Sequence, residues 1–166
     1  MAKESKTIDT SDREMIISRL VNAPRELVFK VWTDPKHIDK WWGPNGFTNT
    51  FLEMNVKPGG VARFIMHGPN GVDYPNRIIY TDVIKPEKIV YVHDSDIDND
   101  PSRFETTITF ESQGNKTLIT LRAVFVTAEE YQKVVKEYGA IEGGNQTLSR
   151  FEEFLMEVQE EELRKN

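Results

Sequence analysis

Residues 145–166 read NQTLSRFEEFLMEVQEEELRKN, and this closing stretch decides how the rest of the chain is interpreted. Leu148, Phe151 and Leu155 recur at the spacing of one helical face, while Glu and Arg occupy the opposite face. A helix with such an apolar stripe has to lie against another apolar surface. The stretch therefore predicts a long amphipathic helix that is covered by an apolar layer formed elsewhere in the chain.

Residues 47–126 can form that layer, because apolar residues alternate there with polar ones at a period of two. Short clusters of Gly, Pro, Asn and Asp separate the alternating segments, as is typical of an antiparallel meander with one apolar face. The rows predicted to face inward are Phe64 and Met66; Ile89, Tyr91 and His93; Phe104, Thr106, Ile108 and Phe110; and Ile119, Leu121, Ala123 and Phe125.

The segments on either side of the meander complete the predicted fold. A strand is expected at residues 13–21, followed by two short helices, the second capped by Asp34. After the meander, Thr127 begins a capping box that opens another short helix. The long amphipathic helix is expected to follow Gly143-Gly144.

The order of one strand, two helices, six strands and a long final helix predicts a single α+β domain over residues 13–163. In this fold a curved antiparallel sheet wraps the C-terminal helix. Residues 1–12 are polar and are expected to form a loose tail. With 166 residues and 38% hydrophobic residues, the chain is long enough for one core and too short for two ordinary domains.

Composition excludes several functional classes. The chain has no cysteine, which removes disulfide scaffolds, thiol nucleophiles and thiolate metal sites. Its formal charge of −6 argues against a nucleic-acid partner, whose binding depends on cationic contacts. The polar N-terminus lacks the apolar core of a signal peptide, and no apolar run approaches the length of a membrane span. A cytoplasmic protein with no membrane partner is expected.

Short motifs spread over residues 13–158 resemble one known group of proteins. In their order and spacing they are similar to the helix-grip, START-like superfamily, also called SRPBCC, and within it to the family of homologues of the activator of the heat-shock-protein-ninety ATPase. The matching pieces are Ala23–Phe29, Thr33-Asp34-Pro35, Trp41-Trp42-Gly43-Pro44, Lys57-Pro58-Gly59-Gly60, the MHGPNG of Met66–Gly71, Pro86–Val90, and Gly143 followed by Thr147–Phe151.

The resemblance implies a helix-grip, birch-allergen-like fold with a cavity between the sheet and the C-terminal helix. Proteins of this group include ligand binders, cyclase-like enzymes and co-chaperone domains. An aromatic residue is common in the family at the position of Ala62, and a Trp at that of Gly144. Because both residues are small here, the resemblance predicts a roomier cavity than is typical.

The aromatic and apolar residues of the inward rows suggest a ligand-binding site, although the same residues can simply pack a core. We expect the ligand to be a hydrophobic small molecule, oriented by Tyr91 and His93. Since Trp41 and Trp42 occupy adjacent helical positions, one of them is expected to rim the entrance. The candidate ligand-binding residues are Trp41, Trp42, Phe64, Met66, Tyr80, Tyr91, His93, Phe104, Ile108, Phe151 and Leu155.

Two other functions remain open from the sequence. A cyclase-like or hydrolase-like enzyme would use the same pocket with His93 as a proton shuttle. A co-chaperone-like protein would stimulate the ATPase of a heat-shock chaperone through its surface. The sequence argues against catalysis, because no nucleophile is paired with a base. No cofactor is expected.

No metal site is expected either. The three histidines lack metal-ligand spacing. The loop from Asp94 to Glu105 places carboxylates at the first, third, fifth, seventh and twelfth positions, as in a calcium-binding loop. However, Asn99 stands where the turn glycine belongs, and Pro101 follows at the eighth position. A solvated acidic hairpin is therefore the expected structure of this loop.

Overall fold

The computed structural model of the chain describes residues 9–165, so residues 1–8 of the predicted tail lie outside the described residues. The part of this segment that is described is tied to the sheet. The hydroxyl of Thr10 accepts a hydrogen bond from Arg122 at 2.8 Å and donates one to Glu14 at 2.7 Å.

Seven strands form one antiparallel sheet, in the spatial order β1-β7-β6-β5-β4-β3-β2. The first strand of the chain therefore pairs with the last, and all other neighbours are consecutive, as the meander pattern predicts. The strands are β1 (Glu14–Val21), β2 (Thr48–Met54), β3 (Val61–His67), β4 (Asp73–Ile84), β5 (Lys88–Asp94), β6 (Phe104–Gln113) and β7 (Lys116–Phe125).

The helices lie where the sequence places them, between β1 and β2 and after β7. The side chain of Asp34 accepts a hydrogen bond from the Lys36 amide at 2.9 Å, and Thr127 accepts one from the Glu130 amide at 3.1 Å, so both predicted caps are confirmed. The helices are α1 (Arg25–Thr33), α2 (Pro35–Trp41), α3 (Ala128–Tyr131) with the π-helical turn η1 (Gln132–Glu137), and α4 (Ala140–Lys165).

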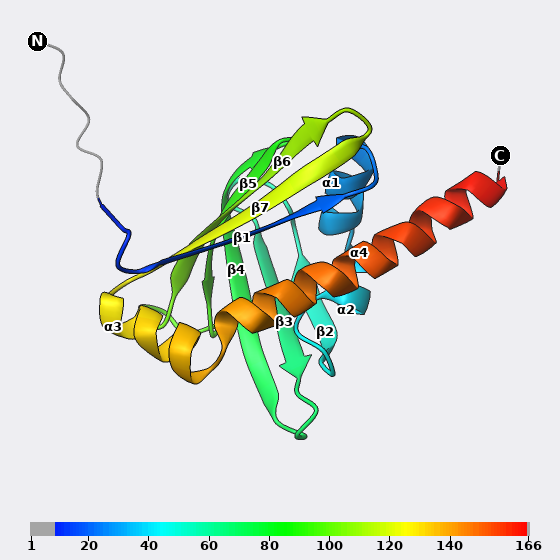
Figure 1. Cartoon of the computed structure of the whole chain (residues 1–166). Helices are drawn as coiled ribbons and strands as arrows, with labels where there is room; N and C mark the ends of the chain where they lie inside the picture. Colours follow the sequence, from blue (N-terminus) through cyan, green and yellow to red (C-terminus); the bar gives the residue numbers. More distant parts are fainter. Residues whose placement is uncertain (1–8, 166) are drawn as a thin grey trace, which may run out of the picture.

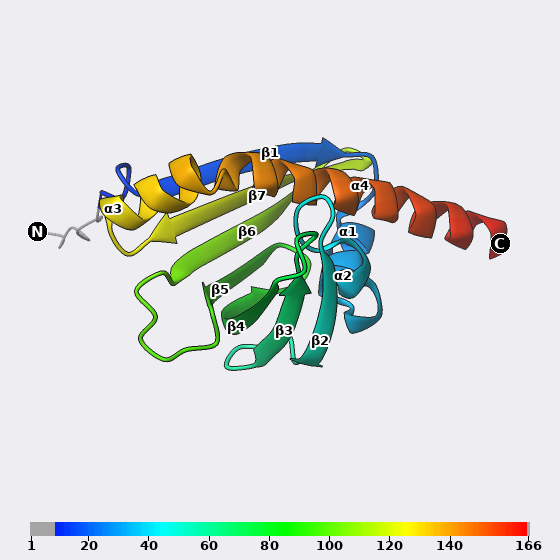
Figure 2. The ribbon, with the colours of Figure 1, turned by 90° about the horizontal axis from the view of Figure 1, so that it is seen from below.

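The sheet curves around α4, which confirms the predicted α+β helix-grip fold. Figure 1 shows α4 running across the concave side of the sheet, with α1 and α2 near its middle and α3 beyond its N-terminal end. In Figure 2, seen from below, the sheet curls away from β1 and β7 toward β2, and the last turns of α4 project past the strands. No helix within residues 9–165 is both long and apolar enough to cross a membrane.

The long helix begins earlier than expected, at Ala140 instead of after Gly143-Gly144. Glycine in a helix interior costs about 1 kcal/mol relative to alanine, which is why the pair suggested a boundary. The structure gives a reason for Gly144, because a Cβ atom there would lie only 2.6 Å from Cδ1 of Ile17. The glycine lets α4 lie close to β1.

A group of packed aromatic rings fills the half of the interior beneath α1 and α2. Trp32 lies at its centre, with ring centroids 4.7 Å from Trp41, 4.8 Å from Phe151 and 5.7 Å from Phe110. These side chains are almost fully buried. This packing leaves the larger open space to the other half of the interior.

Candidate functional site

A cavity of about 250 Å³ lies between the N-terminal half of α4 and the concave face of the sheet. It occupies the half of the interior that the aromatic group leaves open. Its floor comes from β5, β6 and β7, and its roof from α4 and the turn before it. The lining residues are Met15, Trp32, Trp42, Gly43, Pro44, Met66, Tyr91, His93, Phe104, Thr106, Leu121, Ala123, Phe125, Val134, Tyr138, Gly139, Ala140, Gly143, Gly144 and Thr147.

Strand register brings the residues of the floor together. On β5 and β6, His93 lies opposite Phe104 and Tyr91 lies opposite Thr106. On the next pair, the same two β6 residues lie opposite Phe125 and Ala123 of β7. Because side chains in a strand alternate between faces, these rows point together toward α4. The period-two pattern of the sequence is thus what creates the floor.

The eleven candidate residues divide into two groups. Five of them line the cavity: Trp42, Met66, Tyr91, His93 and Phe104. The other six lie in the packed core beside it: Trp41, Phe64, Tyr80, Ile108, Phe151 and Leu155. The two groups differ because the bulky residues of α1 and α2 fill one half of the interior. A role in ligand binding stays a prediction for the first group.

Trp41 and Trp42 both point inward, contrary to the expectation that one of them rims the entrance. Their side chains are buried, and their ring centroids lie 5.6 Å apart. The helical spacing does not apply, because α2 ends at Trp41 and Trp42 has the extended dihedral angles φ −64° and ψ 138°. The change of backbone conformation turns the second ring back toward the interior.

Sequence reasoning assigned no site role to Thr106, Trp32 or the α4 residues Ala140, Gly143 and Thr147, all of which line the cavity. Thr106 carried a usable signal, since it is a polar residue in an inward apolar row. Of the two small residues that suggested a roomier cavity, Gly144 lines it. Ala62 is fully buried in the core instead.

Arg150 of α4 holds the loop that forms one wall of the cavity. Its Nη1 donates to the carbonyl oxygens of Trp42, Gly43 and Pro44 at 3.2, 2.8 and 2.7 Å, and its Nη2 donates to that of Phe47 at 3.1 Å. Burial lowers the pKa of this guanidinium below its ordinary value. Since arginine stays protonated even so, the side chain acts as a charged clamp on four carbonyl groups.

The loop itself requires a glycine at its turn. Gly43 has a φ of +95°, which disfavours residues with a side chain. A Cβ atom there would also lie 2.8 Å from Cε of Met66. The Trp-Gly-Pro motif and Arg150 of the later motif thus meet in space and shape the same wall.

His93 is a neutral hydrogen-bond donor in the cavity floor. The residue is 9% exposed, and Nε2 lies 2.7 Å from Oδ1 of Asn76. Because an amide oxygen only accepts, Nε2 carries the proton and donates. Burial lowers the pKa of His93 to about 4, and the nearby Asp94 and Asp100 only partly oppose this shift.

Stability is expected to fall as His93 is forced to take up a proton. An unfolded histidine has a pKa of about 6.5, so the unfolded chain binds this proton more readily than the native one. The neutral His93 makes its full contribution to stability above pH 6.5. This contribution is lost as the pH falls to about 4, which lowers the free energy of unfolding by about 3 kcal/mol.

Urea unfolding of the wild type and of His93→Gln over this pH range measures the effect as a difference between their slopes. The carboxylates titrate in both proteins and cancel in the comparison. His67→Gln serves as the control, because His67 bonds Asp73 and Thr50 on the outer face of the sheet. Parallel slopes for the wild type and His93→Gln would contradict the prediction.

The acidic hairpin after β5 is exposed to solvent from Ser95 to Asn99, as expected, and it is also tied to a cation. Arg77 of β4 contacts Asp94 at 2.7 Å, Asp98 at 3.1 Å and Asp96 at 3.8 Å. Hydrogen bonding to Asp94 raises the pKa of Arg77 above its ordinary value. These carboxylates are directed at a guanidinium, and within residues 9–165 no group of acidic or histidine side chains is arranged to hold a metal ion.

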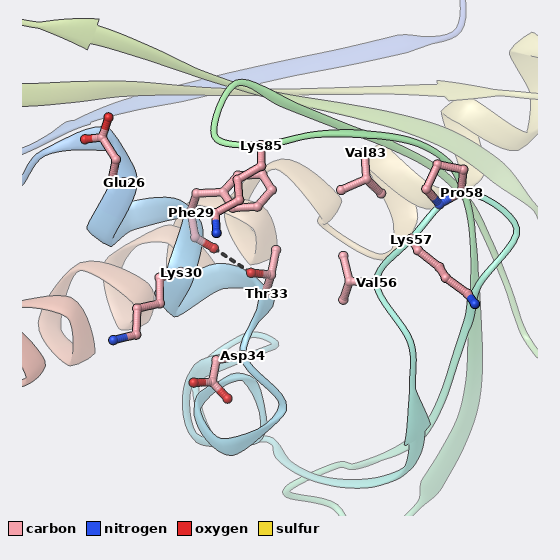
Figure 3. Close-up of a pocket in the computed structure, with 10 residues that line it drawn as sticks. All are labelled: Glu26, Phe29, Lys30, Thr33, Asp34, Val56, Lys57, Pro58, Val83 and Lys85. Atoms are coloured by element: carbon pink, nitrogen blue, oxygen red, sulfur yellow. Dashed lines mark hydrogen bonds between the residues drawn. The ribbon is translucent and has the colours of Figure 1, made fainter.

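A second hollow, of about 840 Å³, opens on the outside of the molecule between α1 and the loops after β2 and β4. Figure 3 shows charged side chains of both signs around it, and Thr33 donating to the carbonyl of Phe29 at 2.8 Å. The inner cavity has a uniformly uncharged lining and is the better candidate site. The outer hollow is lined by Glu26, Phe29, Lys30, Thr33, Asp34, Val56, Lys57, Pro58, Val83 and Lys85.

Comparison with protein families gives one match that covers most of the chain. Residues 22–156 match the family described as activator of Hsp90 ATPase homolog 1-like protein. No curated protein matches the chain.

Solved structures share the fold at low sequence identity. A solution structure of a protein from Arthrobacter aurescens has a TM-score of 0.82 and 24% identity, covering 92% of this chain and 91% of that one. A crystal structure from Mycobacterium smegmatis has a TM-score of 0.78 and 24% identity, covering 89% and 93%. One from Nitrosomonas europaea has a TM-score of 0.79 and 22% identity, covering 92% and 99%. At these identities the likeness shows the fold alone.

Proposed function

We propose that this chain, which belongs to the activator of Hsp90 ATPase homolog 1-like family, binds a small hydrophobic molecule in the cavity beneath α4. The observation that carries the proposal is the cavity itself, a partly open space of about 250 Å³ with aromatic and aliphatic walls. Ligand pockets commonly measure about 300–1,000 Å³, so a compact ligand suits this one.

The apolar lining provides the binding energy. Transfer of apolar ligand surface out of water contributes about 25 cal/mol per Å², so burying about 200 Å² contributes about 5 kcal/mol before the costs of association. The aromatic side chains of Trp32, Trp42 and Phe104 contribute apolar surface to this lining. Because Arg150 holds the wall that contains Trp42, the cavity is largely formed before a ligand enters.

The same lining favours binding over the enzymatic alternative. A proton shuttle needs a group that exchanges protons near neutral pH, whereas burial lowers the pKa of His93 to about 4 and its Nε2 is held by Asn76. Among the described residues that line the cavity, none is an aspartate, glutamate, lysine or arginine. A reacting group there would have no charged partner.

Tryptophan fluorescence tests the proposal directly, because Trp32 and Trp42 line the cavity. Titration with a broad panel of compact hydrophobic compounds is expected to change the emission with saturation at one equivalent. A Trp41→Phe variant should keep the response, since Trp41 lies in the packed core. An unchanged spectrum across the whole panel would overturn the proposed function.

A further inference from the structure

We propose that the ligand is uncharged and presents one hydrogen-bonding group, such as a hydroxyl, carbonyl or amide, to the hydroxyl of Thr106. This inference rests on the proposed function and assigns a chemical class to the molecule that the cavity selects. Three observations support it: the Thr106 hydroxyl has no hydrogen-bond partner, the polar groups beside it are engaged or neutral, and the cavity lining carries no charge.

Thr106 is the polar group without a partner. The residue is 1% exposed, is the third residue of β6 and lines the cavity. Its Oγ1 makes no hydrogen bond to the described protein atoms. Buried hydroxyl groups nearly always have a partner, and leaving one unsatisfied costs about 1–3 kcal/mol. A ligand that supplies the partner recovers this cost.

The neighbouring polar groups are already engaged or neutral. Nε2 of His93 is bonded to Asn76, and the Thr147 hydroxyl donates to the Gly143 carbonyl at 2.9 Å. Burial raises the pKa of Tyr91, and Tyr80 adds to this rise, while polar contact with the Thr106 hydroxyl opposes it, so the phenol stays neutral. Tyr91 lies opposite Thr106 in the β5–β6 pair, but the two hydroxyl groups do not have the geometry of a hydrogen bond, so Oγ1 is left to pair with a ligand.

The lack of charge in the lining decides between neutral and ionised ligands. A carboxylate that enters this cavity loses its hydration and gains no cation in return, which is strongly unfavourable. The guanidinium of Arg150 is directed at carbonyl oxygens of the wall, and Arg77 is directed at the acidic hairpin. The cavity therefore favours an alcohol, phenol, ketone or amide over a fatty acid or other organic anion.

The test uses three rigid compounds of matched shape: naphthol, methylnaphthalene and naphthoate, substituted at the same ring carbon. Dissociation constants are measured by calorimetry at neutral pH with the whole chain. For the wild type, naphthol is expected to bind at least about tenfold more tightly than naphthoate. It is also expected to bind more tightly than methylnaphthalene, because only naphthol partners Thr106.

Thr106→Val removes the hydroxyl and keeps the shape of the side chain. We expect it to weaken naphthol binding about tenfold and to leave methylnaphthalene unchanged or bound more tightly. Thr107→Val is the matched control, because the next residue of β6 points to the opposite face of the sheet. This variant is expected to bind all three compounds like the wild type, which also verifies that a valine at this strand is tolerated.

The outcomes separate the inference from the proposed function. If the wild type binds naphthoate as tightly as naphthol, or if Thr106→Val weakens naphthol and methylnaphthalene equally, the cavity binds ligands but the assigned class is wrong. If none of the three compounds binds, the inference is overturned, and the proposed function falls with it only if the fluorescence panel also gives no response. A preference for naphthol over methylnaphthalene that is lost in Thr106→Val and kept in Thr107→Val would support the assigned class of ligand.

Discussion

Replacing Arg150 by methionine is expected to lower the free energy of unfolding by about 4 kcal/mol. Methionine keeps most of the apolar stem but removes the donors to four carbonyl oxygens of the Trp42–Phe47 loop. Net contributions of hydrogen bonds to charged groups are about 1.5–3 kcal/mol, and rehydration of the partly exposed carbonyls keeps the total below the sum. The free energy of unfolding of Arg150→Lys should lie between those of the wild type and of Arg150→Met, because one ammonium group cannot reach all four oxygens.

Urea unfolding measures this effect, and Arg164→Met is its control on the same helix. Arg164 is highly exposed and, among residues 9–165, pairs only with Glu160 one turn away, so its replacement is expected to change stability by less than about 0.5 kcal/mol. The loop also forms a cavity wall, so Arg150→Met should bind ligand more weakly than the wild type even where both are folded. Equal stability of Arg150→Met and Arg164→Met would show that the clamp contributes little.

Replacing Gly144 by tryptophan is expected to abolish ligand binding, with a loss of more than about hundredfold in affinity. The new side chain starts at the cavity wall, and an indole takes up most of a space of about 250 Å³. Its Cβ would meet Cδ1 of Ile17 at 2.6 Å, but this is the flexible end of a side chain and can rotate away. A moderate cost in stability, about 1–3 kcal/mol, is expected from the tighter packing.

Calorimetry with any compound that binds the wild type checks this result. Ile141→Trp adds the same side chain to an exposed position of α4, 41% accessible, and should bind normally. The sealed variant also addresses the co-chaperone alternative that the family name suggests. Stimulation of a heat-shock chaperone ATPase through the surface would survive Gly144→Trp, whereas a function of the cavity would not. Normal ligand binding by Gly144→Trp would contradict the location of the site.

Much of the cavity lining follows from the sequence alone. Met66, Tyr91, His93 and Phe104 were predicted from the period-two rows, because alternation along each strand is a local property that pairing only brings into register. The apolar stripe of α4 likewise predicted that the sheet encloses this helix. Local periodicity is enough to say which side chains face the interior.

The position of the empty space within that interior could not be predicted. It depends on how far the rings of Trp32, Trp41 and Phe151 extend, which is a property of packed volumes and not of any pattern. The expectation that one of Trp41 and Trp42 rims the entrance was wrong, because the helix ends one residue earlier than the spacing assumed.

Two polar features could not be predicted either, because both depend on the tertiary structure. Arg77 and Asp94 become partners only through the register of β4 and β5. The missing partner of Thr106 is likewise a fact about its surroundings in three dimensions. Neither can be read from neighbours in the sequence.

The pairing of β1 with β7 has a consequence for biosynthesis. Contacts between residues so distant in sequence form late, since the chain must first close a long loop. When β1 to β6 have emerged from the ribosome, the sheet still lacks β7 and its apolar side is uncovered. Such a state is prone to aggregation. The cavity is therefore formed only after α4 has been translated, so the proposed ligand would bind to the completed protein and not to the nascent chain.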